Sequence, residues 1–423
     1  MLATTAAADT SVPQKIVGFR VRGKSKLTER TLGYLMHVEL GEEVSVTDLP
    51  RLEQALLTSE LFESMSVTLE EAPGGVLVVA NLDDKHSWIV APTVFVLPGN
   101  RAIGAGFAEN DLGGEDRKLL LYGQVGDRNT FFFGTYLDPA VHGSKWQYRF
   151  DVYPLHRVID EYTNANKRDF SVARSTDFTF LDAGVLVGYA FQWWLVADAR
   201  FRGAYQYYRH ARNEDTNTEL PTPEKDGWDV TVQTRLTLDA RGHRFGLTWG
   251  PYAQLTLENS IPGLDSYGWG DAVLRTYYSW ALFGDHELEL RGSLAAGYHL
   301  PFNEEITLGS ETDLRGYSSE QFRGDVRAFA RAEYSIPLFR YKWLAFRALG
   351  FYDTGVIGWE FQRDDRAYLP TQASGTSVWR NDVGAGLRVY VKSIVLPLLG
   401  FDIGYGIEGH SPEFYFELGL TDF

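Results

Sequence analysis

A polar loop in the last third of the chain carries the residues whose types and spacing best suit a specific interaction. The loop reads LGSETDLRGYSSEQFRG over residues 308–324, and in it Arg315 stands between Leu314 and the pair Gly316 and Tyr317. A guanidinium presents a rigid fork of donors, and it binds carboxylates more strongly than a neutral donor does. Glycine lets the backbone approach another element closely. This segment therefore fits an arginine that leaves water for an acidic partner, with the tyrosine covering the pair.

Two later segments carry acidic residues whose strand face can be read from the sequence. RAEYSIP contains Glu333. FYDTG contains Phe351, Asp353 and Gly355. Side chains alternate between the two faces of a strand, and the apolar face around FYDTG is formed by Leu344, Phe346, Ala348, Tyr352 and Val356. This parity puts the two acids, with Phe351 and Gly355, on the opposite face, which the loop would meet. The alternative is an ordinary polar loop whose arginine meets only solvent.

Other kinds of chemistry find little support in the sequence. It has no Gly-x-Ser-x-Gly elbow, no His-Glu-x-x-His pair, no phosphate-binding loop and no Cys. A net charge of −16 without a cluster of Lys and Arg speaks against a nucleic-acid surface. We therefore predict that the protein is not an enzyme, that it uses no metal or other cofactor, and that it does not bind nucleic acid.

Residues 15–86 form a small unit that differs from the rest of the chain. KIVGFRVRG predicts a strand, and TERTLGYLMHVELG predicts a helix that opens at Thr28 and closes at Gly41. A second helix and a hairpin around Pro73-Gly74-Gly75 follow. The order βααββ is that of a small α+β domain. Residues 1–14 are small and polar, and we expect them to be a disordered mature N-terminus.

From residue 87 to residue 423 the hydrophobic period changes to two. In DHELELRGSLAAGYHL, apolar side chains alternate with charged and small ones from Leu288 to Tyr298. About sixteen such runs of about 10 to 16 residues follow one another, joined alternately by short turns and long loops. We predict a mainly β protein whose second part is a transmembrane antiparallel barrel. The alternative is a soluble β-sandwich, which also alternates apolar and polar positions.

The chain resembles the BamA-type outer-membrane assembly and translocation superfamily. SELFESMSVTLE, in which a helix runs into a Leu-Phe pair and then a strand, is similar to a POTRA repeat, and one such repeat is seen. Leu314-Arg315-Gly316-Tyr317 resembles the family's (Val or Leu)-Arg-Gly-(Phe or Tyr) motif in the sixth long loop. FYDTG resembles the Phe-x-Asp-x-Gly motif of the thirteenth strand. The chain also resembles the barrel part of members fused to a patatin-like lipase, although we expect no lipase domain here.

The resemblance implies a fold and a set of site residues. It implies one POTRA domain over residues 15–86 and a sixteen-stranded barrel over residues 87–423. The loop is expected to fold back into the lumen, where Asp353, on the thirteenth strand, and Glu333, on the twelfth, hold Arg315.

A weak seam is expected where the first and last strands of the barrel meet. Pro92 has no amide hydrogen, and Gly404 and Gly406 belong to a group of glycines on the other side of the junction. Few ladder hydrogen bonds should form there, and in the family this junction is similar to a lateral gate. The alternative is that Pro92 sits at a bulge. The terminal Phe423 falls on the opposite parity from Phe416, which suggests a further bulge.

The leading functional hypothesis is insertion or translocation of polypeptide clients across the bacterial outer membrane. The POTRA domain would lie in the periplasm and add an incoming strand to its sheet edge. Expected partners are outer-membrane lipid, lipopolysaccharide and an unfolded or secreted polypeptide. The alternatives are a structural or homodimeric anchor barrel without insertase activity, and a plugged pore.

Overall fold

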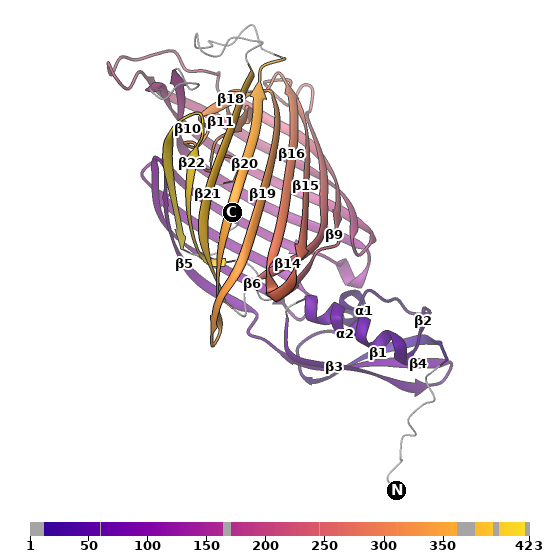
Figure 1. The fold of residues 1–423 in the computed structure, drawn as a ribbon. Coiled ribbons are helices and arrows are strands. Elements are labelled where there is room, and N and C mark those ends of the chain that lie inside the picture. The colour runs from indigo at the N-terminus through magenta and orange to yellow at the C-terminus, as the bar shows by residue number, and fades with distance from the viewer. Residues whose placement is uncertain are drawn as a thin grey trace.

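The protein consists of a small N-terminal domain joined to a large β-barrel (Figure 1). The structure is a computed structural model, and it describes residues 12–59, 61–163, 171–244, 246–310, 312–361, 377–391 and 397–418. The predicted disorder of residues 1–14 falls mostly outside this part of the chain, although the first strand already begins at Gln14. Residues 85–87 connect the domain to the barrel.

The N-terminal domain is a four-stranded sheet with two helices packed on it. Its sheet order is β2-β1-β4-β3, in which β1 and β4 are parallel. The elements are β1 (Gln14–Lys24), α1 (Glu29–Leu35), β2 (Glu43–Val44), η1 (Val46–Asp48), α2 (Leu49–Thr58), β3 (Phe62–Ala72) and β4 (Gly75–Asp84). The apolar positions Leu52 and Leu56 of α2 are fully buried, and they pack with Leu32 of α1 into the core of the domain.

The first helix is shorter than its sequence pattern predicts. It begins after the N-cap Thr28, whose side chain accepts a hydrogen bond from the Thr31 amide, but it ends at Leu35 rather than near Gly41. The cause is local, because His37 adopts a left-handed φ of 56° that a right-handed helix cannot continue through.

Sixteen antiparallel strands close the barrel, as predicted from the alternating pattern. The strands of the barrel wall are β5 (Trp88–Leu97), β6 (Asn100–Leu112), β7 (Arg117–Gly126), β8 (Asn129–Asp138), β9 (Trp146–Thr163), β10 (Ser171–Gln192), β11 (Leu195–Arg212), β12 (Gly227–Asp239), β14 (Leu247–Ser260), β15 (Gly270–Ala281), β16 (Glu287–Tyr298), β19 (Val326–Tyr341), β20 (Leu344–Gly358), β21 (Ser377–Val391), β22 (Pro397–Gly406) and β23 (Ser411–Leu418). The short β13 (Gly242–Arg244) only extends the hairpin between β12 and β14.

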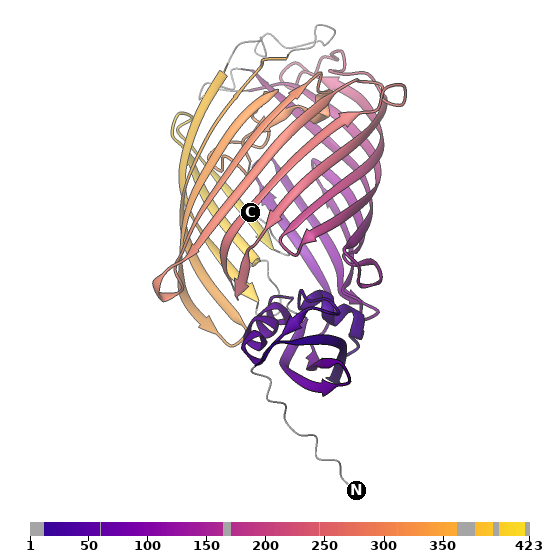
Figure 2. The same ribbon diagram turned by 90° about the vertical axis from the view of Figure 1, so that its right-hand side faces the viewer.

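The connections differ at the two ends of the barrel. Short turns gather at the end that carries the N-terminal domain, among them η2 (Val141–Gly143) and η3 (Phe283–Asp285), and longer connections gather at the other end (Figures 1 and 2). We call these the domain end and the loop end. The strands β9 and β10 extend far toward the loop end, since β9 continues to Thr163 and β10 begins at Ser171.

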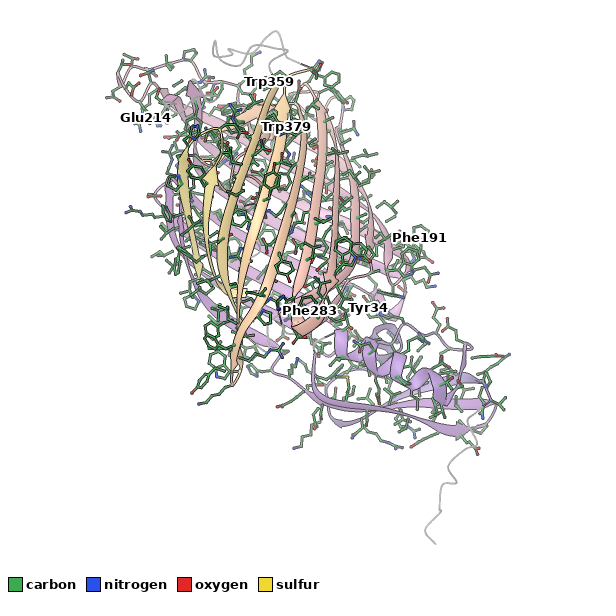
Figure 3. All side chains as sticks on the ribbon, in the orientation of Figure 1. Tyr34, Phe191, Glu214, Phe283, Trp359 and Trp379 are labelled. Carbon is green, nitrogen blue, oxygen red and sulfur yellow. The ribbon has the colours of Figure 1, made fainter. Side chains whose placement is uncertain are left out.

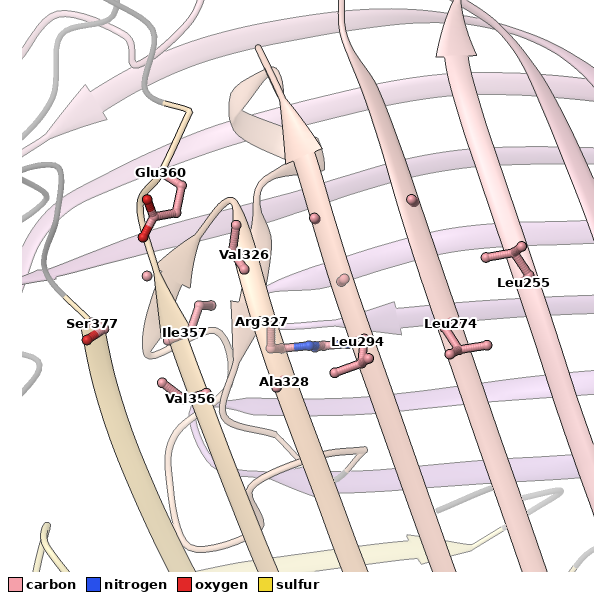
Figure 4. A pocket seen from close by; sticks show the side chains of 14 residues that line it. Leu255, Leu274, Leu294, Val326, Arg327, Ala328, Val356, Ile357, Glu360 and Ser377 are labelled. Carbon is pink, nitrogen blue, oxygen red and sulfur yellow. The ribbon is translucent and has the colours of Figure 1, made fainter.

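The outer wall of the barrel is apolar and exposed. Leu181, Leu236 and Leu294 remain 50%, 48% and 54% exposed on alternate, outward positions of their strands. A shallow apolar groove runs over part of this wall, where Leu274, Leu294 and Val356 surround it (Figure 4). Water does not favour so much exposed apolar surface, whereas a closed sheet satisfies every backbone group in hydrocarbon. The strands therefore span a membrane.

No helix in the described residues has the length and apolar character needed to cross a membrane.

The N-terminal domain packs directly on turns at the domain end. Tyr34 of α1 lies just beneath the barrel (Figure 3). The Thr28 amide donates to the Gly114 carbonyl at 2.9 Å in the β6–β7 turn. Further along, Glu39 pairs with Lys145 at 2.8 Å after β8, and His37 stacks on Trp193 with ring centroids 5.1 Å apart in the β10–β11 turn.

Glycine makes the tightest of these approaches possible. Gly114 has a left-handed φ of 72°, and a Cβ built there would lie 1.9 Å from the Lys26 carbonyl oxygen. No other residue would allow the two backbones to lie so close. The domain is therefore held against one part of the barrel rim.

Asp116, in the same turn, makes this docking dependent on pH. The pKa of Asp116 is raised to about 6, chiefly by burial and also by the nearby acids Asp111 and Asp138, against the opposing effect of Lys118. A carboxyl group whose pKa is raised in the docked state stabilises docking below that pKa and opposes docking above it. Docking should thus be stronger at pH 5 than at pH 7.5, by up to about 1 kcal/mol.

Spin labels on Glu71→Cys in β3 and Phe283→Cys at the barrel rim would measure this docking as a distance distribution. We expect a narrower distribution at pH 5 than at pH 7.5. Asp116→Asn keeps the side-chain shape, tolerates the left-handed backbone and removes the charge. That variant should be narrow at both pH values, and a pH response that persists in it would show that another group is responsible.

Candidate functional site

The connection between β16 and β19 folds into the barrel and crosses its lumen. This lumen loop, residues 299–325, contains η4 (Phe302–Glu304), β17 (Ile306–Leu308) and β18 (Phe322–Gly324). The strands β17 and β18 form a small hairpin. Its apolar residues Leu308, Leu314 and Tyr317 are buried in a cluster with inward side chains of the barrel wall. The loop is therefore packed inside the barrel rather than extended into solvent.

Arg315 is the centre of the loop's contacts with the wall. Its side chain is fully buried, and its Nε and Nη2 donate to the two carboxylate oxygens of Asp353 at 3.0 and 3.2 Å. Its Nη1 donates to Glu333 and to Asp402, both at 3.1 Å. One guanidinium thus binds three carboxylates on β19, β20 and β22. Such charge-assisted contacts compensate the cost of removing the cation from water.

The aromatic cover of the guanidinium is Phe351. Its ring centroid lies 3.3 Å from Arg315 Cζ, which is a close cation–π stack. Gly384 provides the room for that ring, since a Cβ there would lie 2.2 Å from the Phe351 ring. The sequence suggested Tyr317 for this role, but its hydroxyl instead donates to Glu408 at 2.6 Å. Tyr317 therefore fixes the loop farther along, near the turn between β22 and β23.

Two further arginines from the wall share the carboxylates. Arg331 donates to both oxygens of Asp353, at 2.9 and 3.2 Å, and to the backbone carbonyl of Asp313 in the loop at 2.7 Å. Arg388 donates to both oxygens of Asp402, at 2.7 and 2.8 Å. The wall therefore holds each aspartate in place on its own, and Arg315 joins the two pairs into one network.

The loop backbone touches the wall at glycine positions. The Gly316 amide donates to Asp382 at 3.1 Å. A Cβ on Gly404 would lie 2.1 Å from the Arg315 carbonyl oxygen, and one on Gly406 would lie 2.5 Å from the Gly316 carbonyl oxygen. Gly355 has a similar role, because a Cβ there would meet Leu308 of the loop at 3.0 Å.

The placement of Gly404 and Gly406 corrects the sequence interpretation, which assigned them to the seam. Both lie on β22, which pairs with β21 and β23 and not with the first strand β5. They are small because the loop backbone needs the space. The sequence analysis assigned these glycines to the seam because glycine is also common where strands pair poorly.

The seam itself lies between β23 and β5. Within the described residues, Phe416, Glu417 and Leu418 pair with Val96, Phe95 and Val94. The described register ends at Val94, so any pairing of Pro92 with the last strand falls outside the described residues, as does Phe423. Pro92 pairs with Ala105 of β6 in an unbroken register, so the β5–β6 ladder has no bulge there. The predicted weakness of pairing at Pro92 stays a prediction.

The other end of the lumen loop binds the opposite wall. Phe302 is buried among aromatic residues of β10 and β11. Arg202 of β11 donates to Glu304 at 3.1 Å, and Arg157 of β9 donates to Asn303 at 3.1 Å. The loop therefore connects the β9–β11 wall to the β19–β22 wall through the lumen.

Asp382, Asp402, Arg331 and Arg388 were missed from the sequence, although a pattern shared with Asp353 marks the two aspartates. Asp353, Asp382 and Asp402 each stand two positions before an inward glycine, on the adjacent strands β20, β21 and β22. The repeated Asp-x-Gly would have indicated one acidic patch lined by small residues. Arg331 and Arg388 carry no comparable signal, because arginines also recur elsewhere on inward positions of the barrel.

The described residues contain no group of three or more His, Cys, Asp or Glu side chains arranged to hold a metal ion.

Comparisons with known proteins agree with this architecture. The profile of the Omp85 superfamily domain matches residues 111–421. Among solved structures, BamA from Haemophilus ducreyi lacking POTRA domains 1–3 has a TM-score of 0.61 at 14% identity, over 96% of this chain and 84% of that one. CdiB from Acinetobacter baumannii has a TM-score of 0.60 at 14% identity, over 96% and 74% of the two chains. CdiB from Escherichia coli has a TM-score of 0.63 at 12% identity, over 95% and 76%. No curated protein sequence matches the chain.

Replacing Arg315 tests how much the network stabilises the barrel. Arg315→Ala leaves Glu333 without its cation and opens a buried gap, so we expect it to lower the free energy of unfolding by about 2 to 4 kcal/mol. Arg315→Lys keeps the charge but loses the two-pronged contact with Asp353, so its loss should be smaller. Heat-modifiability on gels measures the change. Arg101→Ala, at an exposed arginine outside the network, is the control, and an Arg315→Ala barrel as stable as this control would contradict the docked loop.

Replacing Gly404 tests the steric fit without removing a charge. The Cβ of Gly404→Ala would meet rigid loop backbone, so we expect the loop to leave its position. Gly350→Ala is the matched control, since a Cβ there meets nothing closer than 3.9 Å. Trypsin cleavage after Arg315, read by mass spectrometry, should appear in Gly404→Ala and not in Gly350→Ala. Equal resistance of both variants would show that the wall adapts to the extra methyl group.

Proposed function

The chain belongs to the Omp85 superfamily, and from this premise we propose that it handles polypeptide clients at the bacterial outer membrane, by insertion or secretion. The observation that carries the proposal is the combination of a membrane-spanning barrel with a lumen loop fixed to two opposite walls. The solved structures it resembles are named BamA and CdiB, and they share its fold over at least 95% of this chain. In this proposal the protein acts without catalysis. Its site positions the lumen loop and does not make or break a bond in a substrate.

The N-terminal domain fits the role of a single POTRA domain in the periplasm. Its sheet ends in β3 on one side, and in the described residues β3 pairs only with β4. An edge strand presents unpaired backbone groups to which an extended client can add as a further strand. Because the domain is docked beside the barrel mouth, a client bound at this edge would be held close to the lumen.

The seam between β5 and β23 is the proposed exit for client strands. Residues of β23 before Phe416 make no pairs with β5 in the described part of the chain. Opening here breaks fewer described ladder bonds than opening the β5–β6 pair, which is registered along the whole of β5. Of the two junctions that β5 makes, the seam has the fewer registered pairs in the described part of the chain, which favours it as the place where the barrel opens sideways.

The second candidate function is a static barrel, an anchor or a plugged pore, alone or as a homodimer. The loop that spans the lumen favours it, because the loop's buried ion pairs resist displacement. The two functions differ in whether the seam must open. A covalent lock across the seam therefore distinguishes them.

The absence of Cys allows such a lock to be made without background. Phe95 and Glu417 stand directly opposite each other across the seam, so Phe95→Cys with Glu417→Cys should form a disulfide. The purified protein in liposomes is given a urea-denatured eight-stranded barrel protein as the client. We expect oxidation to slow client insertion at least about 10-fold and reduction to restore it. The reason is that the hydrogen bonds between β5 and β23 must break before a client strand can enter the seam.

The control lock joins strands far from the seam. Leu236→Cys with Leu255→Cys pairs β12 and β14 in register, and oxidising it should leave insertion unchanged. Undiminished insertion with the seam locked would remove the gate and favour a static barrel. A client that inserts no faster than into empty liposomes would remove the insertase function itself.

A further inference from the structure

A polar cavity lies in the lumen, separate from the Arg315 network. It has a volume of about 700 Å³ and is enclosed between the inner wall formed by β14, β15, β16 and β19 and one side of the lumen loop. Four arginines line it: Arg241, Arg275, Arg291 and Arg327. The loop contributes backbone and hydroxyl groups, including those of Ser310, Thr312 and Ser319. Neither Arg315 nor any of its three carboxylate partners lines this cavity.

Three of the four arginines already have acidic partners. Arg241 pairs with Asp239 at 2.7 Å, Arg291 pairs with Glu289, and Arg327 pairs with Asp313 at 3.3 Å. The other lining carboxylate, Glu320, is bound by Arg157 and Arg323. The two carboxylates that line the cavity, those of Asp313 and Glu320, are thus already paired with other arginines.

Arg275 is the cation without a partner. It makes no ion pair or hydrogen bond with any other residue in the described part of the chain, and it is exposed to the cavity from the middle of β15. Asp271, four residues away on the same face, interacts with Arg275 electrostatically but forms no ion pair or hydrogen bond with it in the described residues, and the Oδ1 of Asp271 has no hydrogen-bond partner there. The Nε of Arg327 is likewise buried without a partner. Guanidinium donors that face a water-filled cavity without a hydrogen-bond partner suit an acceptor from outside the chain.

We propose that this cavity binds a water-soluble anion that carries a phosphate group, with Arg275 as its principal contact. A phosphate presents several acceptor oxygens, which suits guanidinium forks on the wall together with hydroxyl groups on the loop better than a carboxylate does. The volume is in the range of small-molecule sites. The closed sheet separates the cavity from the hydrocarbon, so the ligand arrives through water at a barrel mouth and not from the lipid phase.

The bound anion would stabilise the docked loop. Its contacts come from the wall on one side and from the loop on the other, so it binds only when the two are together. A ligand that binds one arrangement shifts the population toward it. This coupling does not depend on what client the barrel handles, and it can be measured on the purified protein.

The first experiment follows thermal unfolding of the purified full-length protein in detergent as inorganic phosphate replaces NaCl at constant ionic strength. We expect a saturable rise in the unfolding temperature of about 2 to 4 °C. Arg275→Gln should abolish it with little loss of basal stability, because the Arg275 side chain makes no ion pair or hydrogen bond in the described residues. Arg101→Gln, at an exposed arginine outside the cavity, should keep it. Acetate at the same ionic strength should have no such effect.

The second experiment locates the anion. Ser319 is exposed to the cavity and makes no hydrogen bond of its own in the described residues, so Ser319→Cys can be labelled by a soluble maleimide. Phosphate should slow this labelling severalfold, and it should not slow labelling of Asp215→Cys in a distant exposed loop. The proposal is overturned if phosphate does no more than NaCl, if Arg275→Gln responds like the unaltered protein, or if acetate protects equally.

Discussion

The buried guanidinium of Arg315 determines how the interior of the barrel is organised. Asp353, Asp402 and Glu333 point inward from three strands, and Arg331 and Arg388 supply two of the three cations they require. Only the loop can bring the third. Leaving one of these carboxylates without its cation in a closed space would cost several kcal/mol. The wall therefore needs the loop as much as the loop needs the wall, and the position of the whole segment follows from one ion-pair network.

Small residues make that network geometrically feasible. The strands β20, β21 and β22 place a glycine two positions after each inward aspartate, so the wall beside the acidic patch carries no side chains at these positions. The loop backbone packs against the glycines of β22, and the Phe351 ring occupies the space next to Gly384. Charge and shape thus act together, because carboxylates on a crowded wall would be out of reach of a short loop carrying one arginine.

The sequence was sufficient for the main features of the fold, and its resemblance to a known family indicated the first partners of Arg315. Strict alternation identified the barrel strands, and parity alone placed Asp353 and Glu333 on the inner face. Asp402 was missed because it lies 87 residues from Arg315, on a strand whose alignment in the closed ring no local pattern reveals. Gly404 and Gly406 were misassigned for the same reason. The role of Tyr317 was missed because it depends on Glu408, in a turn whose position only the closed barrel determines.

The sequence positions of the loop's partners have a consequence for the order of assembly. Asp402, Glu408, Glu413 and Tyr415 all belong to the last strands of the chain, and each contacts the segment from Arg315 to Ser318. Translation delivers these strands after the loop, so the loop's binding site is not complete until the C-terminal end of the chain is in place. A chain that lost its last two strands would keep the contacts of the loop with Asp353 and Glu333 but would lack all four of these groups.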